Sequence, residues 1–393
     1  MVTLGERIAE TKRRLDDGAE RFGAVDAALR PEIERVVERG NAVVPQVAWA
    51  DVISGLAPAD LPERVRRHGC VVVRGVFARA LADDWNAEIA LYLARNDADG
   101  RIRDRYATRW RGGAPQMYSV YWSAPQVQAR QSATLADVRA WLNGLWHHAG
   151  AFDPARDCSY ADRVRRRTAG DATLGLGPHV DGGTVGRWLG RGSLPYRPIL
   201  AGDPAAFDPF SAAHRVDAPD GDDSNVCGAF RTWQGWTALT AQGPGDGTLQ
   251  VVPIARAIAW VLLRPFARDT PEASLCGAEA ASALRIMPEW HAPLLRALVP
   301  IPHVEPGDTV WWHPDLIHAV EARHDGVRES NVMYIPAAPD CARNRSFLAR
   351  QLPCFLHGRS PPDFPADDFE QDFRGRAGPD VLSALGRRQM GLD

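Results

Sequence analysis

Hydrophobic positions along the chain fall in short runs that glycine, proline and aspartate interrupt. The run Gly69–Phe77 is rich in β-branched residues and carries glycines near both ends, which predicts a buried strand. The stretch that follows, Ala78–Asn96, has the amphipathic spacing of a helix. A series of short strands with turn signals between them is typical of an all-β sandwich or barrel. Six later runs predict such strands: Met117–Trp122, Arg163–Thr168, Trp236–Ala241, Thr248–Pro253, Thr309–His313 and Asn331–Pro336.

Helical patterns flank this β-rich region. Residues Leu4 to Gly40 are charged with helical spacing, and Pro31 predicts a break at Arg30–Pro31, because proline disfavours helical geometry in the preceding residue and suits a helix start. The proline- and aspartate-rich stretch Pro209–Asn225 predicts a surface excursion within a domain. The fold class that follows is mainly β with flanking helices, an α+β protein.

The basic residues of the chain are almost all arginine, since Lys12 is the only lysine. P-loop NTPases, protein kinases, pyridoxal enzymes and Ser-Lys hydrolases each need a lysine inside a specific motif, and Lys12 lies in none of these motifs. The net charge of -3 provides no basic field for nucleic acid or an anionic membrane. We therefore expect a small-molecule substrate, and the sequence leaves the oligomeric state undetermined.

The six cysteines are scattered and form no C-x-x-C motif. The N-terminal residues contain no apolar segment of the kind found in secretory signals, so we expect reduced thiols in a cytoplasmic protein. The longest apolar run, Ala257–Leu263, is too short to span a bilayer.

The glycine-rich stretch Gly175–Trp188 contains one histidine and one aspartate two residues apart. A β-strand places residues i and i+2 on the same face, so His179 and Asp181 could reach one metal ion. The glycines around the pair would let substrate and backbone approach closely, or would form a tight turn at the strand end.

A third ligand is sought in Glu305–Pro336, where His313 and His318 compete. Two histidines and one carboxylate with open positions suit non-haem Fe(II). We favour His318 because Arg328 and Ser330 follow it on the next strand, where they could bind a dicarboxylate cosubstrate. His313 is then a structural residue or one that supports a metal ligand. The pair His303 and Glu305 lies too close in sequence to the distal histidine for the strands of a jelly roll to intervene, and is predicted to be a loop.

The motifs HVDGG, GDTVWWHPDLIHAV and RES together resemble the Fe(II)- and 2-oxoglutarate-dependent dioxygenases, and GDTVWWHPDLIH is similar to phytanoyl-CoA-dioxygenase-like members. The wider pattern resembles a bacterial and fungal family of proposed oxygenases formerly of unknown function. The resemblance implies a double-stranded β-helix core of the jelly-roll, cupin-like kind. We expect a helical N-terminal cap at 1–60, this core with insertions at 61–340, and a C-terminal wrap of the same domain at 341–393.

The resemblance also implies the chemistry. His179, Asp181 and His318 would hold Fe(II), Arg328 and Ser330 would bind the far carboxylate of 2-oxoglutarate, and O2 would take the remaining position. Release of succinate and CO2 would accompany oxidation of an unactivated C–H bond by hydroxylation, desaturation or cyclisation. Halogenases of this superfamily lack the carboxylate ligand, so the retained Asp181 argues against halogenation.

The substrate pocket is predicted less sharply. The arginines at 163, 165 and 167 alternate along one predicted strand, and a solvated or salt-bridged strand face is the commoner reading of each. If some point inward, the substrate is small and anionic, such as an amino acid. Other residues could also face the barrel, and the full set of pocket candidates is Gln116, Tyr118, Tyr121, Arg163, Arg165, Arg231 and Trp236.

Two rival functions stay open. A redox-silent cupin-like protein could use the same ligands for isomerisation, hydrolysis or binding, although it has no need of the Arg328 and Ser330 pair. A hydroxylase or demethylase of protein side chains would share the cofactors, although the sequence contains no obvious reader domain or acidic peptide-binding run.

Overall fold

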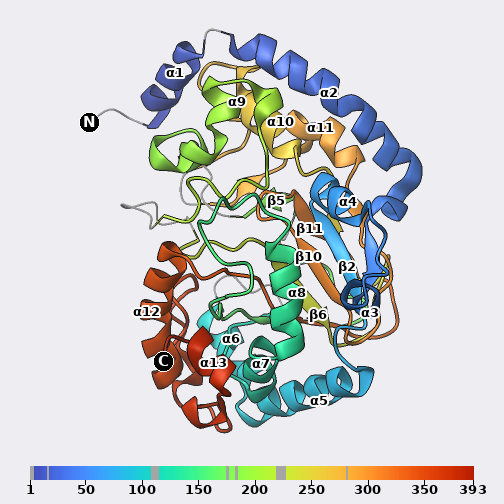
Figure 1. Cartoon of the computed structure of the whole chain (residues 1–393), viewed down its shortest axis with the longest axis vertical. Coiled ribbons are helices and arrows are strands. Elements are labelled where there is room, and N and C mark those ends of the chain that lie inside the picture. Colours follow the sequence, from blue (N-terminus) through green and yellow to red (C-terminus); the bar gives the residue numbers. More distant parts are fainter. Residues whose placement is uncertain are drawn as a thin grey trace.

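The computed structural model describes residues 4–15, 17–107, 115–173, 177–181, 185–217, 227–279 and 282–393. Within these residues the chain is a mixed α+β protein with two β-sheets, and helices lie on the outer sides of the sheets (Figure 1). The two long helices nearest the N-terminus lie at one end of the molecule, and the C-terminal helices lie at the opposite end (Figure 1).

The described strands form a seven-stranded sheet in the order β1-β2-β10-β6-β12-β4-β3 and a five-stranded sheet in the order β8-β5-β11-β7-β9. Apart from the parallel pair β1 and β2, the neighbours within each sheet are antiparallel. The strands of the larger sheet are β1 (Gln46–Ala48), β2 (Cys70–Arg74), β3 (Met117–Tyr118), β4 (Val164–Arg167), β6 (Gln234–Ala238), β10 (Thr309–Trp312) and β12 (Ser330–Tyr334). Those of the smaller sheet are β5 (His179–Val180), β7 (Leu249–Val251), β8 (Leu284–Arg285), β9 (Val299–Pro300) and β11 (His318–Val320).

The inner faces of the two sheets share a hydrophobic cluster. Val72 and Trp236 from the larger sheet meet Val251 from the smaller sheet within it, and all three are almost fully buried. Strand β2 is buried on both faces, because Val71 and Val73 belong to a different cluster from Val72. Burial on both faces explains why this strand reads as a continuous apolar run and not as an alternating one.

Helices cover the outer faces of both sheets. Helices α5 and α8 pack on the larger sheet, and α2 and α10 pack beside the smaller one. The helices are α1 (Leu4–Arg14), α2 (Gly18–Arg39), α3 (Trp49–Ile53), α4 (Leu61–His68), α5 (Arg79–Arg95), α6 (Ala98–Arg105), α7 (Ala124–Arg130), α8 (Ala133–Asn143), α9 (Arg197–Ala201), α10 (Ala257–Leu263), α11 (Pro288–Arg296), α12 (Ala342–His357) and α13 (Ala384–Gln389).

Most of the predicted strands are present in shortened form. The run Gly69–Phe77 contains β2, and the amphipathic stretch after it forms α5. The short strands β1, β8 and β9 were not predicted, and no bounds were predicted for the strands at His179 and His318 that form β5 and β11, because two or three residues carry too little periodicity to be recognised.

Two local predictions were wrong. Helix α2 continues through Pro31 without the predicted break. Pro31 is exposed, whereas Leu29 and Ile33 on either side of it are buried in the cluster that contains α10, so tertiary packing outweighs the lost hydrogen bond. The stretch Pro209–Asn225 is not wholly a surface excursion, since Phe210 and Arg215 are buried; residues 218–225 lie outside the described residues.

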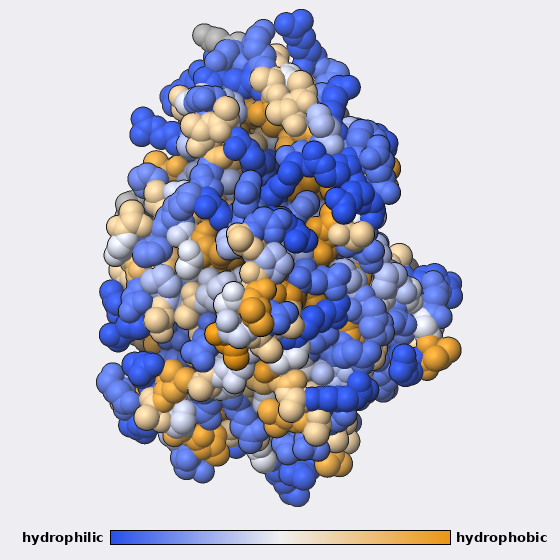
Figure 2. All heavy atoms as spheres, turned by 45° about the vertical axis from the view of Figure 1, so that its right-hand side comes forward, coloured by the Kyte–Doolittle hydropathy of each residue, from blue (hydrophilic) through white to orange (hydrophobic). Residues whose placement is uncertain are grey.

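The outer surface is largely polar. On the face in Figure 2 hydrophilic residues predominate, and hydrophobic residues are visible as separate patches. Among the described helices, none combines the length and the apolar character that crossing a bilayer requires.

Candidate metal centre

Two histidines from distant parts of the chain lie side by side on neighbouring strands of the smaller sheet. His179 on β5 is the direct antiparallel partner of His318 on β11. Their ring centroids are 4.4 Å apart. The residues that follow in each strand, Val180 and Ala319, are buried, and Val180 packs on the outer side of the sheet. Period-two alternation therefore turns both imidazoles toward the space between the sheets.

The two imidazoles are oriented by the same local hydrogen bond. Nδ1 of His179 lies 2.7 Å from the carbonyl oxygen of Gly177, and Nδ1 of His318 lies 2.9 Å from that of Leu316. A ring that donates from Nδ1 to a carbonyl keeps the Nε2 lone pair free. The backbone thus prepares both Nε2 atoms as metal ligands.

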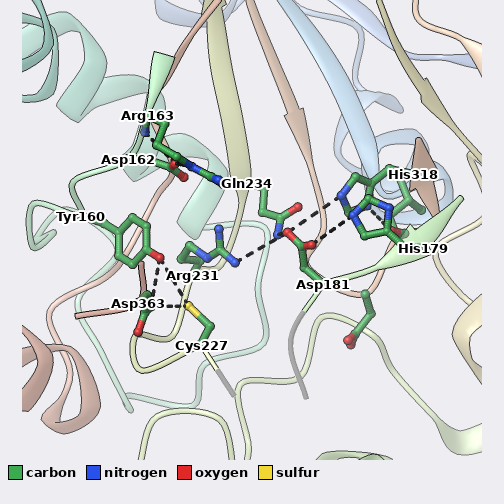
Figure 3. A network of polar contacts seen from close by, with 12 residues as sticks. Tyr160, Asp162, Arg163, His179, Asp181, Cys227, Arg231, Gln234, His318 and Asp363 are labelled. Atoms are coloured by element: carbon green, nitrogen blue, oxygen red, sulfur yellow. Dashed lines mark hydrogen bonds and ion pairs between the residues drawn. The ribbon is translucent and has the colours of Figure 1, made fainter. Parts of the chain in front are cut away.

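Asp181 completes the group. Its Oδ1 lies 3.2 Å from Nε2 of His179, and its Oδ2 lies 3.9 Å from Nε2 of His318 (Figure 3). One potential ligand atom from each of the three residues lies within 4.8 Å of the others. Bonds of about 2.0–2.2 Å from these atoms could meet at one metal ion.

Two further side chains act on the Asp181 carboxylate. Nε2 of Gln234, the first residue of β6, donates to Oδ2 at 2.6 Å. The guanidinium of Arg231 lies 4.0 Å from the same oxygen. Burial alone would raise the pKa of Asp181, but the hydrogen bond with His179 and the charges of His318 and Arg231 hold this pKa well below its usual value. The carboxylate is therefore ionised and ready to bind a cation.

The two histidines differ in their pKa. Burial lowers the pKa of His318 to about 4, and the neighbouring His179 acts in the same direction. Burial also disfavours the charged form of His179, but its contact with Asp181 outweighs this effect and raises its pKa. One imidazole is thus neutral before any metal binds, and the other exchanges its interaction with Asp181 for a metal bond.

The arrangement suits a metal that must keep positions open. Among the described residues, the group of His, Cys, Asp and Glu side chains that could hold a metal consists of these three alone. Two imidazoles and one carboxylate are the donor set of mononuclear non-haem iron sites with free coordination positions.

The other two histidines considered from the sequence lie elsewhere. His313 is fully buried, its Nε2 contacts the carbonyl oxygen of Pro209 at 3.0 Å, and its ring stacks on Trp146. His303 is exposed and contacts Glu305 at 3.0 Å. Neither belongs to the group with Asp181.

The predicted cosubstrate residues are separated in the structure. Ser330 is buried at the start of β12, whereas Arg328 is exposed in the bend before it. The arginine that contacts the Ser330 hydroxyl is instead Arg165 on β4, with Nη2 3.5 Å from Oγ, and this hydroxyl donates to Oε1 of Gln242 at 2.8 Å. The sequence predicted that Arg328 and Ser330 act from one strand face. They do not share one, because Arg328 lies before the strand begins.

The alternating arginines of β4 do not form a solvated face. Arg165 and Arg167 are 3% and 1% exposed, and Arg163 is partly buried. Arg167 donates to the carbonyl oxygens of Gly247, Glu321 and Asp171 and is a structural residue.

The remaining pocket candidates are dispersed. Gln116 donates to the carbonyl oxygen of Ala172. Tyr118 packs in the cluster under α5 and α8, and Tyr121 packs in a separate cluster with Phe355. Trp236 lies in the cluster between the sheets. Of this group, Arg231 is the residue that lies beside Asp181.

Sequence reasoning missed Gln234 and the polar residues around Arg231, which include Tyr160, Cys227 and Asp363 (Figure 3). Gln234 precedes Trp236 by two residues, so strand periodicity could have placed both on one face. The other residues are brought together by loops, for which no local signal exists. Of the glycines around the metal residues, those at 175, 182 and 183 lie outside the described residues.

A family model described as Gig2-like matches residues 2–392. The chain belongs to the Gig2-like family. The uncharacterized protein YbiU of Escherichia coli strain K12 is 40% identical over 383 residues, which are 94% of this chain and 90% of YbiU.

Solved structures share the fold of this Gig2-like chain over nearly its whole length. The "Putative Oxidoreductase from Salmonella typhimurium LT2" superposes with a TM-score of 0.90 at 34% identity, covering 100% of this chain and 98% of the other. GlcNAc Inducible Gene 2, GIG2 (DUF1479), from Candida albicans superposes with a TM-score of 0.82 at 26% identity, covering 98% and 89%.

Proposed function

We propose that this chain is a non-haem Fe(II) enzyme that uses 2-oxoglutarate and O2 to oxidise an unactivated C–H bond of a small, carboxylate-bearing molecule, with release of succinate and CO2. The observation that carries the proposal is the convergence of His179, Asp181 and His318, with Nε2 of both histidines facing the Asp181 carboxylate. The word oxidoreductase in the name of the Salmonella relative agrees with redox chemistry.

The strand order supports a double-stranded β-helix. Along the chain, β4, β6, β10 and β12 lie in the larger sheet, whereas β5, β7 and β11 lie in the smaller one. Such alternation wraps the chain around a common interior and brings an early strand beside a late one, as β5 lies beside β11.

Arg165 is the residue that we assign to the far carboxylate of 2-oxoglutarate. Its side chain is buried, and among the described residues its Nε has no hydrogen-bond partner, no carboxylate pairs with it, and Nη2 makes one long contact of 3.5 Å to the Ser330 hydroxyl. A buried guanidinium without a charged partner is unfavourable, and a carboxylate can satisfy it through two hydrogen bonds. Ser330 keeps the role predicted from the sequence, because its hydroxyl lies beside Arg165. Arg165 takes the place that the sequence predicted for Arg328.

The chain's own residues prepare the site for this reaction. Bound iron supplies O2 activation and C–H cleavage. Asp181 contributes one negative charge to the metal, and Gln234 holds its carboxylate in position. The ring of Trp312 lies 5.6 Å from that of His318 and, with the apolar cluster between the sheets, limits the access of water.

Anaerobic addition of Fe(II) and 2-oxoglutarate tests the proposal. We expect a charge-transfer absorption band in the visible range, which His318→Ala abolishes, and succinate release after O2 is admitted. A folded, iron-loaded protein without the band would favour a redox-silent cupin-like function. Stimulation of succinate release by peptides and not by small acids would instead favour oxidation of protein side chains.

A further inference from the structure

We propose that Arg231 binds the carboxylate of the substrate beside the metal centre, so that the molecule is recognised by its anionic end. This inference rests on the proposed function and adds the group that recognises the substrate. Arg231 lies shortly before β6, and its guanidinium lies between Tyr160 and Asp181 (Figure 3).

The Arg231 side chain is partly buried, and its guanidinium has few polar contacts among the described residues. Its side chain is 13% exposed, and within the described residues its closest acidic contact is Oδ2 of Asp181 at 4.0 Å. None of the hydrogen bonds among the described residues uses its N–H groups as donors. A guanidinium carries five N–H donors, so it has free capacity for an anion.

The neighbouring acids are engaged with other groups. Asp363 accepts hydrogen bonds from the Tyr160 hydroxyl, the Cys227 thiol and the Gly228 amide. Asp162 accepts from the backbone N–H of Arg163 at 2.7 Å and contacts its Nε at 3.4 Å. The acids beside Arg231 are therefore held by other donors.

Metal binding would leave Arg231 without a partner. Before metal binds, the charge of Asp181 is shared between His179 and Arg231; the metal that the proposed function requires would then take up this charge. The groups that would touch the metal, 2-oxoglutarate or the substrate are the divalent metal, Asp181, Arg165, Arg231 and dianionic 2-oxoglutarate itself, and together they carry one net positive charge. A substrate carboxylate balances that charge, whereas a neutral or cationic group does not.

The geometry of Arg231 is fixed in advance. Its guanidinium carbon lies 5.2 Å from the centre of the Tyr160 ring, and the Tyr160 hydroxyl is held at 2.9 Å from Asp363. Stacking of this kind orients the planar group and reduces the entropy lost when a ligand binds. The 4.0 Å distance to Asp181 places a carboxylate on Arg231 beside the metal ligands.

Calorimetric binding of matched acid and amide pairs tests this assignment. The probes are amino acids and hydroxy acids, each compared with its primary amide, on protein loaded with Zn(II) and 2-oxoglutarate so that no turnover occurs. We expect at least one acid to bind more tightly than its amide by on the order of tenfold to a hundredfold. Arg231→Gln should bring this ratio to about one, and Arg231→Lys should retain part of it. The exposed Arg268→Gln is the control and should leave the ratio unchanged.

Three results would overturn the assignment: no acid is preferred over its amide by the natural chain, the preference persists in Arg231→Gln, or Arg231→Gln weakens acids and amides equally. The last result would mean that Arg231 supports Asp181 and does not bind the substrate carboxylate. Arg165→Gln separates the two arginines, because it should weaken 2-oxoglutarate and leave the acid-to-amide ratio intact. Failure of the charge-transfer test would remove the proposed function, whereas the acid preference is measured without iron chemistry.

Discussion

The side-chain amide of Gln234 donates a hydrogen bond of 2.6 Å to Oδ2 of Asp181. This contact links the first residue of β6 in the larger sheet to a carboxylate that directly follows β5 in the smaller sheet. The metal centre is therefore assembled across the two sheets, and its precision depends on how they pack.

Loss of this amide should weaken metal binding. Gln234→Ala leaves the Asp181 carboxylate free to rotate, and removal of such a supporting contact costs about 10- to 100-fold in metal affinity. Calorimetric titration of the natural chain and the variant with Co(II) measures the change in metal affinity. The exposed Gln371→Ala serves as control. Equal affinities for the natural chain and Gln234→Ala would mean that the backbone alone orients Asp181.

His313 and His318 should respond differently to removal of their side chains. His318→Ala deletes a metal ligand and should lower the affinity by more than about a hundredfold. His313→Ala should leave the metal stoichiometry at one but reduce the free energy of unfolding by about 3 kcal/mol, because it removes a buried stacked ring and its hydrogen bonds. Metal titration and urea unfolding of both variants check the prediction, and loss of metal binding in His313→Ala would contradict it.

Removal of the Asp157 carboxylate should lower the stability of the folded chain, because Asp157 belongs to a buried ion pair outside the metal centre. Nη1 of Arg139 lies 2.9 Å from Oδ2 of Asp157, and the two side chains are 1% and 6% exposed. Asp157→Ala leaves an uncompensated buried charge and should lower the free energy of unfolding by about 3–5 kcal/mol. The exposed partner of Arg101, Asp372, offers a matched control, for which Asp372→Ala should cost less than about 1 kcal/mol. Similar losses for the two variants in urea unfolding would contradict this view.

The free energy of unfolding should fall as the pH rises through the range in which Glu370 is protonated in the folded chain but ionised in the unfolded chain. Burial raises the pKa of Glu370 to about 7 in the folded chain, although the Tyr92 hydroxyl and the backbone amides of Tyr121 and Trp122 partly oppose the shift. Between about pH 4.5 and 7 the folded state holds a proton that the unfolded state has lost, so unfolding becomes more favourable with pH. The loss should reach on the order of 3 kcal/mol above pH 7.

Glu370→Gln should flatten this part of the pH profile. Urea unfolding of both chains at intervals between pH 4.5 and 8 gives the slope of the free energy of unfolding against pH. A destabilisation by the amide that is the same at every pH does not change this slope. Parallel profiles would show that Glu370 is already ionised in the folded chain at pH 5.

The amino-acid sequence alone determined the local features of this protein. Period-two alternation places residues i and i+2 on one strand face, and this rule identified His179 with Asp181. The β-branched run before α5 identified a strand that is buried on both faces. The nearly complete lack of lysine excluded whole classes of enzyme chemistry.

Only the tertiary structure decided which distant residues meet. The pairing of β11 with β5 brings His318, and not His313, to His179. The pairing of β12 with β4 brings Arg165, and not Arg328, to Ser330. Loops bring Arg231 beside Asp181 and Tyr160 beside Arg231. Local periodicity sets the face on which a side chain lies, whereas the choice of neighbouring strands depends on the packing of the whole chain, which no short motif contains.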